Sequence, residues 1–191
     1  MAISQRLKAF LEEARLKYTA AKHPVVYTAQ EIAAAQHVPG RQLAKCVLVK
    51  TEHGPALAVL PAIHLIDLKK LKGVLGVKSL SIAKEADIKQ LFPDVEVGAM
   101  SPFGNLYGVP VVVDRGLSDA GEIVFNAGSH TDTIKMRYQD FAGAARPKSG
   151  AFGLQEGGPK KKARPAAGKR SKTKATKRRA ARKPARKKSK R

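Results

Sequence analysis

Cysteine is nearly absent from this sequence, and so is any long apolar run. The one cysteine, Cys46, cannot form an intramolecular disulfide, and this is typical of proteins from a reducing compartment. The N-terminal stretch MAISQRLKAFLEEARLKY has no continuous apolar segment, and no run reaches the roughly 18 apolar residues that span a bilayer. The sequence therefore predicts a soluble, cytoplasmic protein with no membrane partner.

Acidic residues are scarce in the last quarter of the chain. Residues 1–146 carry 18 Lys and Arg against 14 Asp and Glu, whereas residues 147–191 carry 19 against one. The second segment has only two large apolar side chains, Phe152 and Leu154, which are too few to offset the entropy cost of ordering it. We expect one folded domain over residues 1–146 and a disordered basic tail over residues 147–191.

Helical and strand patterns are intermixed in the first segment. Apolar spacing predicts an amphipathic helix after Ser4, and Thr28 with Glu31 forms a capping box that opens a second helix. Alternation predicts a hairpin with strands at about 44–51 and 56–61. Further helices are expected in HLIDLKKLKGVLG, AKEADIKQLF and YQDFAGAA, and further strands in LYGVPVVVD, EIVFNAG and TDTIKMR. Because no regular βαβ rhythm is present, this order predicts an α+β fold with a mixed or largely antiparallel sheet and peripheral helices.

Motifs for metal binding and thiol catalysis are also missing. The sequence has no CxxC or HExxH, and its five histidines lack metal-ligand spacing, so we expect no metal and no other cofactor. Strand alternation places Cys46 on the face opposite Lys45. A lone cysteine among apolar residues is most often a small buried hydrophobe, so a catalytic thiol is not expected.

Three short segments hold residues that suggest chemistry: LAKCVLVK with Lys45, GAMSPFG at residues 98–104, and NAGSH ending at His130. A lysine on an apolar strand face is either a stem that reaches water or a cation that holds a phosphate or an ester carbonyl. GAMSPFG reads either as a surface turn or as a loop whose glycines admit a ligand and whose N–H groups face an oxyanion. His130 either caps a loop or orients a water molecule.

In this order the three segments resemble the YbaK family, the free-standing relatives of the editing domain of bacterial prolyl-tRNA synthetases, over about residues 3–145. The resemblance implies an α+β domain around a mixed, partly barrel-like sheet. It also implies an aminoacyl-tRNA deacylase that acts on mischarged aminoacyl-tRNA, with a small amino acid on tRNA for proline as the favoured substrate and prolyl-tRNA synthetase as a further partner. The site residues that it implies are Lys45, Gly98, Ser101, Pro102, Phe103, Gly104, Gly128, Ser129 and His130.

The residues and the resemblance together suggest hydrolysis with few protein acids or bases. Lys45 is expected to position the substrate and stabilise charge, because a protonated lysine has no lone pair with which to act as a base. Ser129 lacks the strand-turn-helix elbow of an acyl-enzyme nucleophile. Phe103 either walls the pocket or fills the core. The resemblance implies that the 2′-hydroxyl of the terminal adenosine assists the proton transfer.

The basic tail resembles the Lys-, Ala- and Pro-rich tails of linker-histone-like proteins. Its charge suits any polyphosphate backbone, and its lack of aromatics removes base stacking, so the tail could serve tRNA, DNA or ribosomal RNA. A second function stays open, in which the editing-like domain only binds and the tail dominates as a nucleic-acid-binding segment. The candidate nucleic-acid-binding residues are Lys160, Lys161, Lys162, Arg164, Lys169, Arg170, Lys177, Arg178, Arg179, Arg186, Lys187 and Lys188.

Overall fold

The computed structural model describes residues 3–25 and 27–155. The elements in chain order are α1 (Gln5–Glu13), β1 (Tyr18–Lys22), α2 (Ala29–Ala35), β2 (Ala44–Thr51), β3 (Gly54–Pro61), β4 (His64–Ile66), α3 (Leu68–Leu75), β5 (Leu80–Ile82), α4 (Glu85–Leu91), the 3-10 helix η1 (Gly104–Tyr107), β6 (Val111–Asp114), α5 (Arg115–Ser118), β7 (Glu122–Asn126), β8 (Asp132–Arg137), α6 (Tyr138–Ala145), β9 (Lys148–Gly150) and β10 (Gly153–Gln155). None of the helices within these described ranges is long and apolar enough to cross a membrane.

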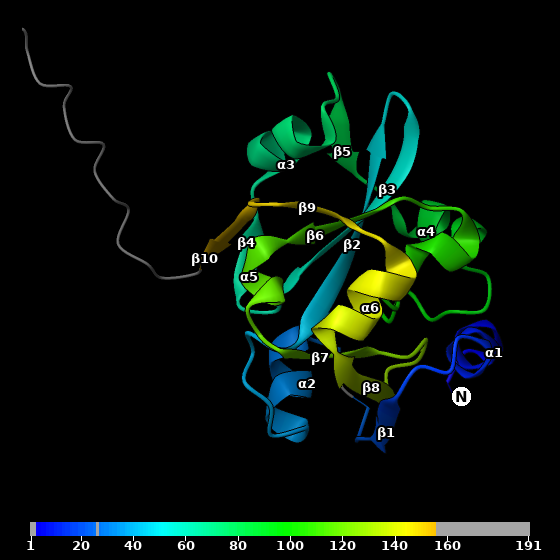
Figure 1. The fold of residues 1–191 in the computed structure, drawn as a ribbon. Helices are drawn as coiled ribbons and strands as arrows, with labels where there is room; N and C mark the ends of the chain where they lie inside the picture. The colour runs from blue at the N-terminus through cyan, green and yellow to red at the C-terminus, as the bar shows by residue number, and fades with distance from the viewer. Residues whose placement is uncertain (1–2, 26, 156–191) are drawn as a thin grey trace, which may run out of the picture. The chain divides into compact units, whose positions relative to one another are not determined.

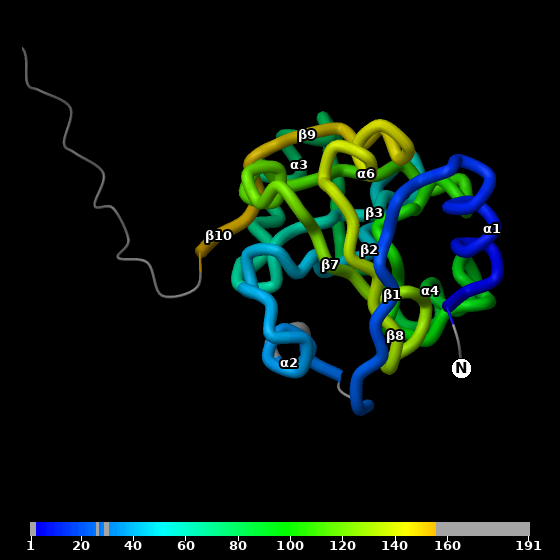
Figure 2. The backbone as a smooth tube through the Cα atoms, turned by 60° about the horizontal axis from the view of Figure 1, so that its bottom comes forward, coloured from blue at the N-terminus to red at the C-terminus, as the bar shows by residue number. Residues whose placement is uncertain are grey.

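The strands form three sheets. The largest has the order β5-β2-β3-β6-β9, the second β1-β8-β7, and the third pairs β10 with β4. The β2–β3 hairpin is antiparallel, whereas β3–β6 and β6–β9 are parallel, so the large sheet is mixed. A parallel bridge between Leu43 and Val124 links β7 to the residue before β2. The helices lie around the outside of the strands (Figures 1 and 2). The predicted α+β class with a mixed sheet and peripheral helices is confirmed.

Apolar side chains cover both faces of the large sheet. Leu57 and Val59 of β3 belong to a core cluster shared with α1, β7, β8 and α6. Ala58 and Leu60, which alternate with them, belong to a second cluster that includes Leu71 of α3. A strand that is buried on both faces needs apolar residues at every position, which explains the unbroken apolar run in ALAVLP.

Side-chain caps set where two of the helices begin. Thr28 caps α2, and the Thr28–Glu31 capping box predicted from the sequence is confirmed. Asp67 caps α3, and its carboxylate accepts two N–H groups of the first turn. The helix predicted within HLIDLKKLKGVLG is confirmed as α3, whereas the three residues before Asp67 form β4 in extended conformation.

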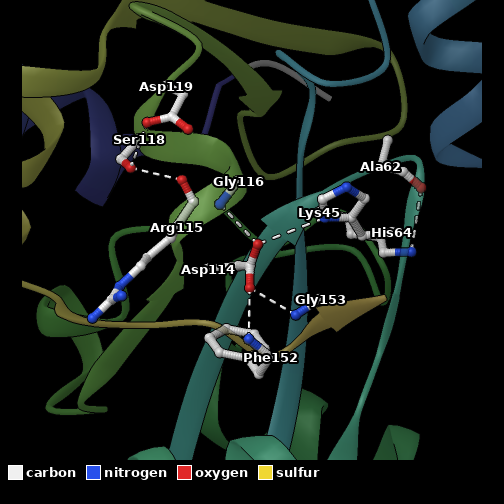
Figure 3. A network of polar contacts seen from close by, with 10 residues as sticks. All are labelled: Lys45, Ala62, His64, Asp114, Arg115, Gly116, Ser118, Asp119, Phe152 and Gly153. Atoms are coloured by element: carbon white, nitrogen blue, oxygen red, sulfur yellow. Dashed lines mark hydrogen bonds and ion pairs between the residues drawn. The ribbon is translucent and has the colours of Figure 1, made fainter. Parts of the chain in front are cut away.

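The folded part extends beyond residue 146, where the sequence placed the domain boundary. Strand β9 pairs with β6, β10 pairs with β4, and Phe152 between them is fully buried in the second core cluster. The Asp114 carboxylate accepts the N–H groups of Phe152 and Gly153, both at 2.7 Å (Figure 3). One aromatic side chain and one buried carboxylate thus hold a segment that its composition assigned to the tail.

Candidate functional site

A small pocket lies where β2, the end of β7 and the loop after α4 meet. Its volume is about 50 Å³. It is lined by Tyr27, Ile32, Leu43, Ala44, Lys45, Cys46, Gly98, Met100 and Asn126. The structure therefore brings together Lys45 and Gly98, which are far apart in the sequence and which the sequence analysis assigned to one site.

Lys45, the second residue of strand β2, lines the pocket. Its backbone sits in the hairpin opposite Leu60, and its side chain is partly buried. The Nζ of Lys45 donates a hydrogen bond to the carbonyl oxygen of Ala62 at 3.3 Å (Figure 3). A carbonyl oxygen accepts only from a donor, so this contact fixes the direction of the ammonium group. A positive charge is thereby held next to the pocket.

Gly98 opens the predicted loop in a left-handed conformation, with φ of 90°. A Cβ at this position would lie 3.5 Å from Cε1 of His130, so the ring of His130 lies directly against Gly98. Within the described residues, neither the N–H of Gly98 nor that of Met100 makes a hydrogen bond, whereas the N–H of Ala99 donates to Glu96. Two peptide donors are thus available in the pocket lining.

Hydrogen bonds clamp this loop to the segment 128–130. The N–H of Gly128 donates to the Ala99 carbonyl, and the N–H of Glu96 donates to the Gly128 carbonyl. The Glu96 carboxylate accepts the N–H of His130 at 2.8 Å. The sequence analysis missed Glu96, because nothing in the local pattern shows that an acid before Gly98 bonds the backbone of a residue so distant in sequence.

His130 has a defined tautomer in this arrangement. Its Nε2 lies 2.9 Å from the Val97 carbonyl oxygen, which can only accept, so Nε2 carries the proton. The opposite nitrogen, Nδ1, is buried and has no hydrogen-bond partner among the residues that the structure describes. One face of the ring packs against Tyr27, with 5.0 Å between the ring centroids. The His130 ring is therefore held between Tyr27 and Gly98 by the bond from Nε2 to Val97.

The second half of the GAMSPFG loop, residues 101–104, does not line the pocket. Ser101, Pro102, Phe103 and Gly104 are all buried. Phe103 is fully buried and packs on Phe10, Phe125 and Phe141, with ring centroids 5.4–5.8 Å apart. Of the two readings of Phe103, the structure supports the one in which it fills the core. Gly104 packs so closely that a Cβ would lie 2.8 Å from the Val109 carbonyl oxygen.

Ser129 also serves the loop instead of the pocket lining. Its buried hydroxyl donates to Asp132 at 2.7 Å, and the Thr131 hydroxyl donates to the same carboxylate oxygen. Burial by itself raises the pKa of Asp132, but the hydrogen bonds from Thr131 and Ser129 outweigh burial and hold the pKa below its usual range. The carboxylate is therefore ionised at neutral pH and fixes the turn that presents His130.

Cys46 packs against the first core cluster, while Val47 packs against the second, as strand alternation predicted. The pocket nevertheless reaches Cys46 as well as Lys45, so the cysteine is not remote from the site. Burial raises the pKa of the Cys46 thiol, and a protonated thiol is a poor nucleophile. Among the described residues no three His, Cys, Asp or Glu side chains are grouped to hold a metal ion.

Two of the pocket residues, Tyr27 and Ile32, lie outside the three segments that the sequence analysis singled out. The Oδ1 atom of Asn126 is buried and has no hydrogen-bond partner within residues 3–25 and 27–155. Larger cavities, of about 480 and 330 Å³, lie beside the N-terminal residues Ile3 and Gln5. They contain neither Lys45 nor Gly98, so volume alone would have pointed to the wrong place. The candidate nucleic-acid-binding residues from Lys160 onwards lie outside the described residues.

Known proteins similar to this chain match it over the segment that contains the candidate site. The profile of the family described as aminoacyl-tRNA editing domain matches residues 23–144, a range that contains Lys45, Gly98 and His130. The prolyl-tRNA editing protein ProX of Acetoanaerobium sticklandii is 28% identical over 158 residues, which are 80% of this chain and 96% of that protein.

A proline–tRNA ligase of Fervidobacterium nodosum is 34% identical over 92 residues, which are 48% of this chain but only 16% of the ligase. A crystal structure described as a candidate trans-editing enzyme for prolyl tRNA synthetase superposes with a TM-score of 0.71 at 20% identity. That match covers 79% of this chain and 96% of the other, and it shows that the two share a fold.

Proposed function

This chain belongs to the family of aminoacyl-tRNA editing domains, which makes it an aminoacyl-tRNA deacylase, and we propose that it removes a small wrong amino acid from tRNA for proline. The observation that carries the proposal is the pocket that Lys45, Gly98 and Met100 line together, with the ring of His130 packed against Gly98. Lys45, Gly98, Gly128, Ser129 and His130 take part, the first two in the pocket and the others in the turn beside it.

The reaction needs an oriented water and a place for negative charge. Water attacks the ester carbonyl carbon, the new C–O bond forms, the bond to the 3′-oxygen breaks, and a proton passes to that oxygen. The developing oxyanion is stabilised by Lys45 and by the N–H groups of Gly98 and Met100. His130, whose Nδ1 is buried, holds the wall of the pocket by packing against Gly98 and Tyr27, and the adjacent 2′-hydroxyl of the substrate assists the proton transfer. Most of the rate then comes from positioning.

The size of the pocket supports a small substrate side chain. The pocket is small, at about 50 Å³, and this supports a substrate side chain of few heavy atoms. Met100 and Ile32 close its sides with apolar surface, which favours an alkyl or thiol side chain over a charged one. The match to a prolyl-tRNA editing protein over 80% of this chain supports tRNA for proline. The match to part of a proline–tRNA ligase suggests prolyl-tRNA synthetase as a partner.

Purified protein should hydrolyse alanyl-tRNA for proline faster than correctly charged prolyl-tRNA. The measurement is release of radiolabelled amino acid from a panel of tRNAs for proline charged with alanine, cysteine, serine, threonine or proline. Larger side chains should be cleaved more slowly, since they exceed the pocket. If no ester is cleaved faster than in buffer, the domain only binds, and the alternative function of a nucleic-acid-binding protein is correct.

We further propose that the basic tail increases affinity for the RNA substrate. A truncation after Gly158 retains β9 and β10 and removes residues 159–191, so it leaves the folded unit intact. The expected result is a higher KM, an unchanged kcat at saturation, and a shallower dependence of log KM on log salt concentration, because fewer phosphates are neutralised. The measurement is initial rate at several salt concentrations. If the truncation leaves the dependence of log KM on log salt concentration unchanged, the tail does not bind the substrate, and DNA or ribosomal RNA remains as its target.

A further inference from the structure

Tyr27 is an exposed aromatic side chain at the rim of the pocket. It is 74% exposed, the highest value among the exposed large apolar residues of the described chain, and it lines the same pocket as Lys45 and Gly98. An exposed aromatic ring does not gain the free energy that comes from burying its apolar surface. A ring that stays exposed at the rim of a pocket therefore suggests that a ligand covers it.

Two contacts hold Tyr27 in place, one made by its ring and one by its backbone N–H. The Tyr27 ring packs against the ring of His130 in a tilted arrangement, with a centroid distance of 5.0 Å and an interplanar angle of 57°. His130 is in turn fixed by its bonds to Val97 and Glu96. The backbone N–H of Tyr27 donates to Glu31 at 3.3 Å, next to the capping box that starts α2. A side chain anchored in this way loses little further entropy when a ligand covers it.

A purely structural role leaves most of the ring unexplained. Tyr27 precedes the N-cap Thr28, and Ile32 occupies the position that forms a hydrophobic staple with such a residue. Ile32 is itself almost completely buried, so a staple does account for the apolar character of position 27. It does not account for a ring that stays 74% exposed, because a staple stabilises the helix start by being covered.

We propose that the exposed face of Tyr27 stacks on the adenine base of the 3′-terminal nucleotide of the substrate tRNA. This inference rests on the proposed function, because it assumes that the aminoacyl ester lies in the Lys45 pocket. The ester is on the terminal ribose, so the base attached to that ribose must lie within a few ångströms of the pocket rim. An unpaired 3′-terminal base presents two flat faces, and stacking on an aromatic ring is the common way in which proteins hold such a base.

The geometry distinguishes Tyr27 from Tyr107, a tyrosine that is partly exposed but already has partners. Tyr107 donates its hydroxyl to Asp94, packs on Phe92 and has the Arg6 guanidinium over its ring at 4.7 Å. Its ring faces are therefore already in use. Among the described residues, the Tyr27 ring contacts one other ring, that of His130, and most of its surface is exposed and available to a base.

The test is binding of an uncharged acceptor-stem hairpin in which 2-aminopurine replaces the terminal adenine. Stacking quenches 2-aminopurine fluorescence, and no ester bond is needed, so the readout does not depend on hydrolysis. Wild-type protein and Tyr27→Phe should quench the probe. Tyr27→Leu, which keeps an apolar side chain but no ring, should abolish quenching and weaken binding about 5- to 100-fold. Ile82→Ala, an exposed apolar change on β5, serves as the matched control and should behave as wild type.

Kinetics on mischarged tRNA separate stacking from support of His130. Tyr27→Leu should raise KM and leave kcat within a few-fold of wild type, with Tyr27→Phe restoring KM. A fall in kcat with unchanged hairpin binding would mean that Tyr27 acts through His130 and would overturn the stacking proposal. Quenching by wild type that persists in Tyr27→Leu would also overturn it. Hydrolysis without quenching rejects stacking and leaves the proposed function intact, whereas quenching without hydrolysis rejects the function and leaves stacking intact.

Discussion

Replacing Lys45 by alanine should lower kcat for ester hydrolysis about 10²- to 10³-fold, with a smaller effect on KM. The reason is that a charge held by the Ala62 carbonyl next to the pocket is useful mainly when the ester oxygen gains negative charge. A contact made only in the transition state affects kcat, whereas one made equally in the ground state affects KM. The measurement is single-turnover deacylation of mischarged tRNA at saturating enzyme.

Two variants test whether the charge of Lys45 causes the loss. Lys45→Met keeps an unbranched stem that can pack as the lysine stem does, and it should be as inactive as Lys45→Ala. Lys50→Ala is the matched control, because Lys50 lies on the same strand, pairs with Asp87 at 2.9 Å on the surface and is outside the pocket. An exposed ion pair contributes little, so both activity and stability should stay near wild type. Full activity of Lys45→Met would show that the charge of Lys45 has no part in the reaction and that its side chain only extends into water.

The hairpin that carries Lys45 could be predicted because its signals are local. Two apolar runs joined at a Gly-Pro turn specify β2 and β3, and the capping residues Thr28 and Glu31 specify the start of α2. The period of two along β2 also placed Cys46 and Val47 on opposite faces, as the two core clusters show. Local patterns of this kind report on residues close in sequence, and there the prediction was correct.

The features that sequence reasoning missed depend on contacts between distant residues. Glu96 bonds the backbone of His130, and Tyr27 packs on its ring, although these residues lie in three separate segments. The domain boundary was misplaced for the same reason. A basic stretch with one phenylalanine looks like a tail, until Asp114 and the second core cluster supply partners for Phe152. Such partners become visible only when the sheet order is known.

The GAMSPFG loop shows how a motif divides into two roles. Gly98, at its start, lies at the pocket against His130, whereas Phe103 and Gly104, at its end, are packed in the core. The core residues fix the position of the end of the loop, and the clamp to residues 128–130 fixes its start. The residues of this motif therefore serve two purposes: the start of the loop forms the pocket, and its end packs in the core.

Phe103→Ala should lower the free energy of unfolding by about 3–5 kcal/mol and the melting temperature by about 6–20 °C. Phe103 is fully buried and contacts three other phenylalanine rings, so its removal leaves a cavity that α1, β7 and α6 cannot all move to fill. The measurement is thermal and urea unfolding followed by circular dichroism. Leu65→Ala, which removes a large but half-exposed apolar side chain, is the control and should cost far less.

The same variant decides between the two readings of Phe103. If Phe103 fills the core, deacylation by Phe103→Ala measured well below its melting temperature should keep the same ranking of amino acids as wild type. A pocket wall would behave in the opposite way, because its removal enlarges the pocket and admits larger side chains while stability is little changed. Unchanged unfolding with faster cleavage of larger amino acids would therefore contradict the core assignment. The Phe103 ring packs between Phe10, Phe125 and Phe141 and is absent from the pocket lining, so we expect a loss of stability with specificity retained.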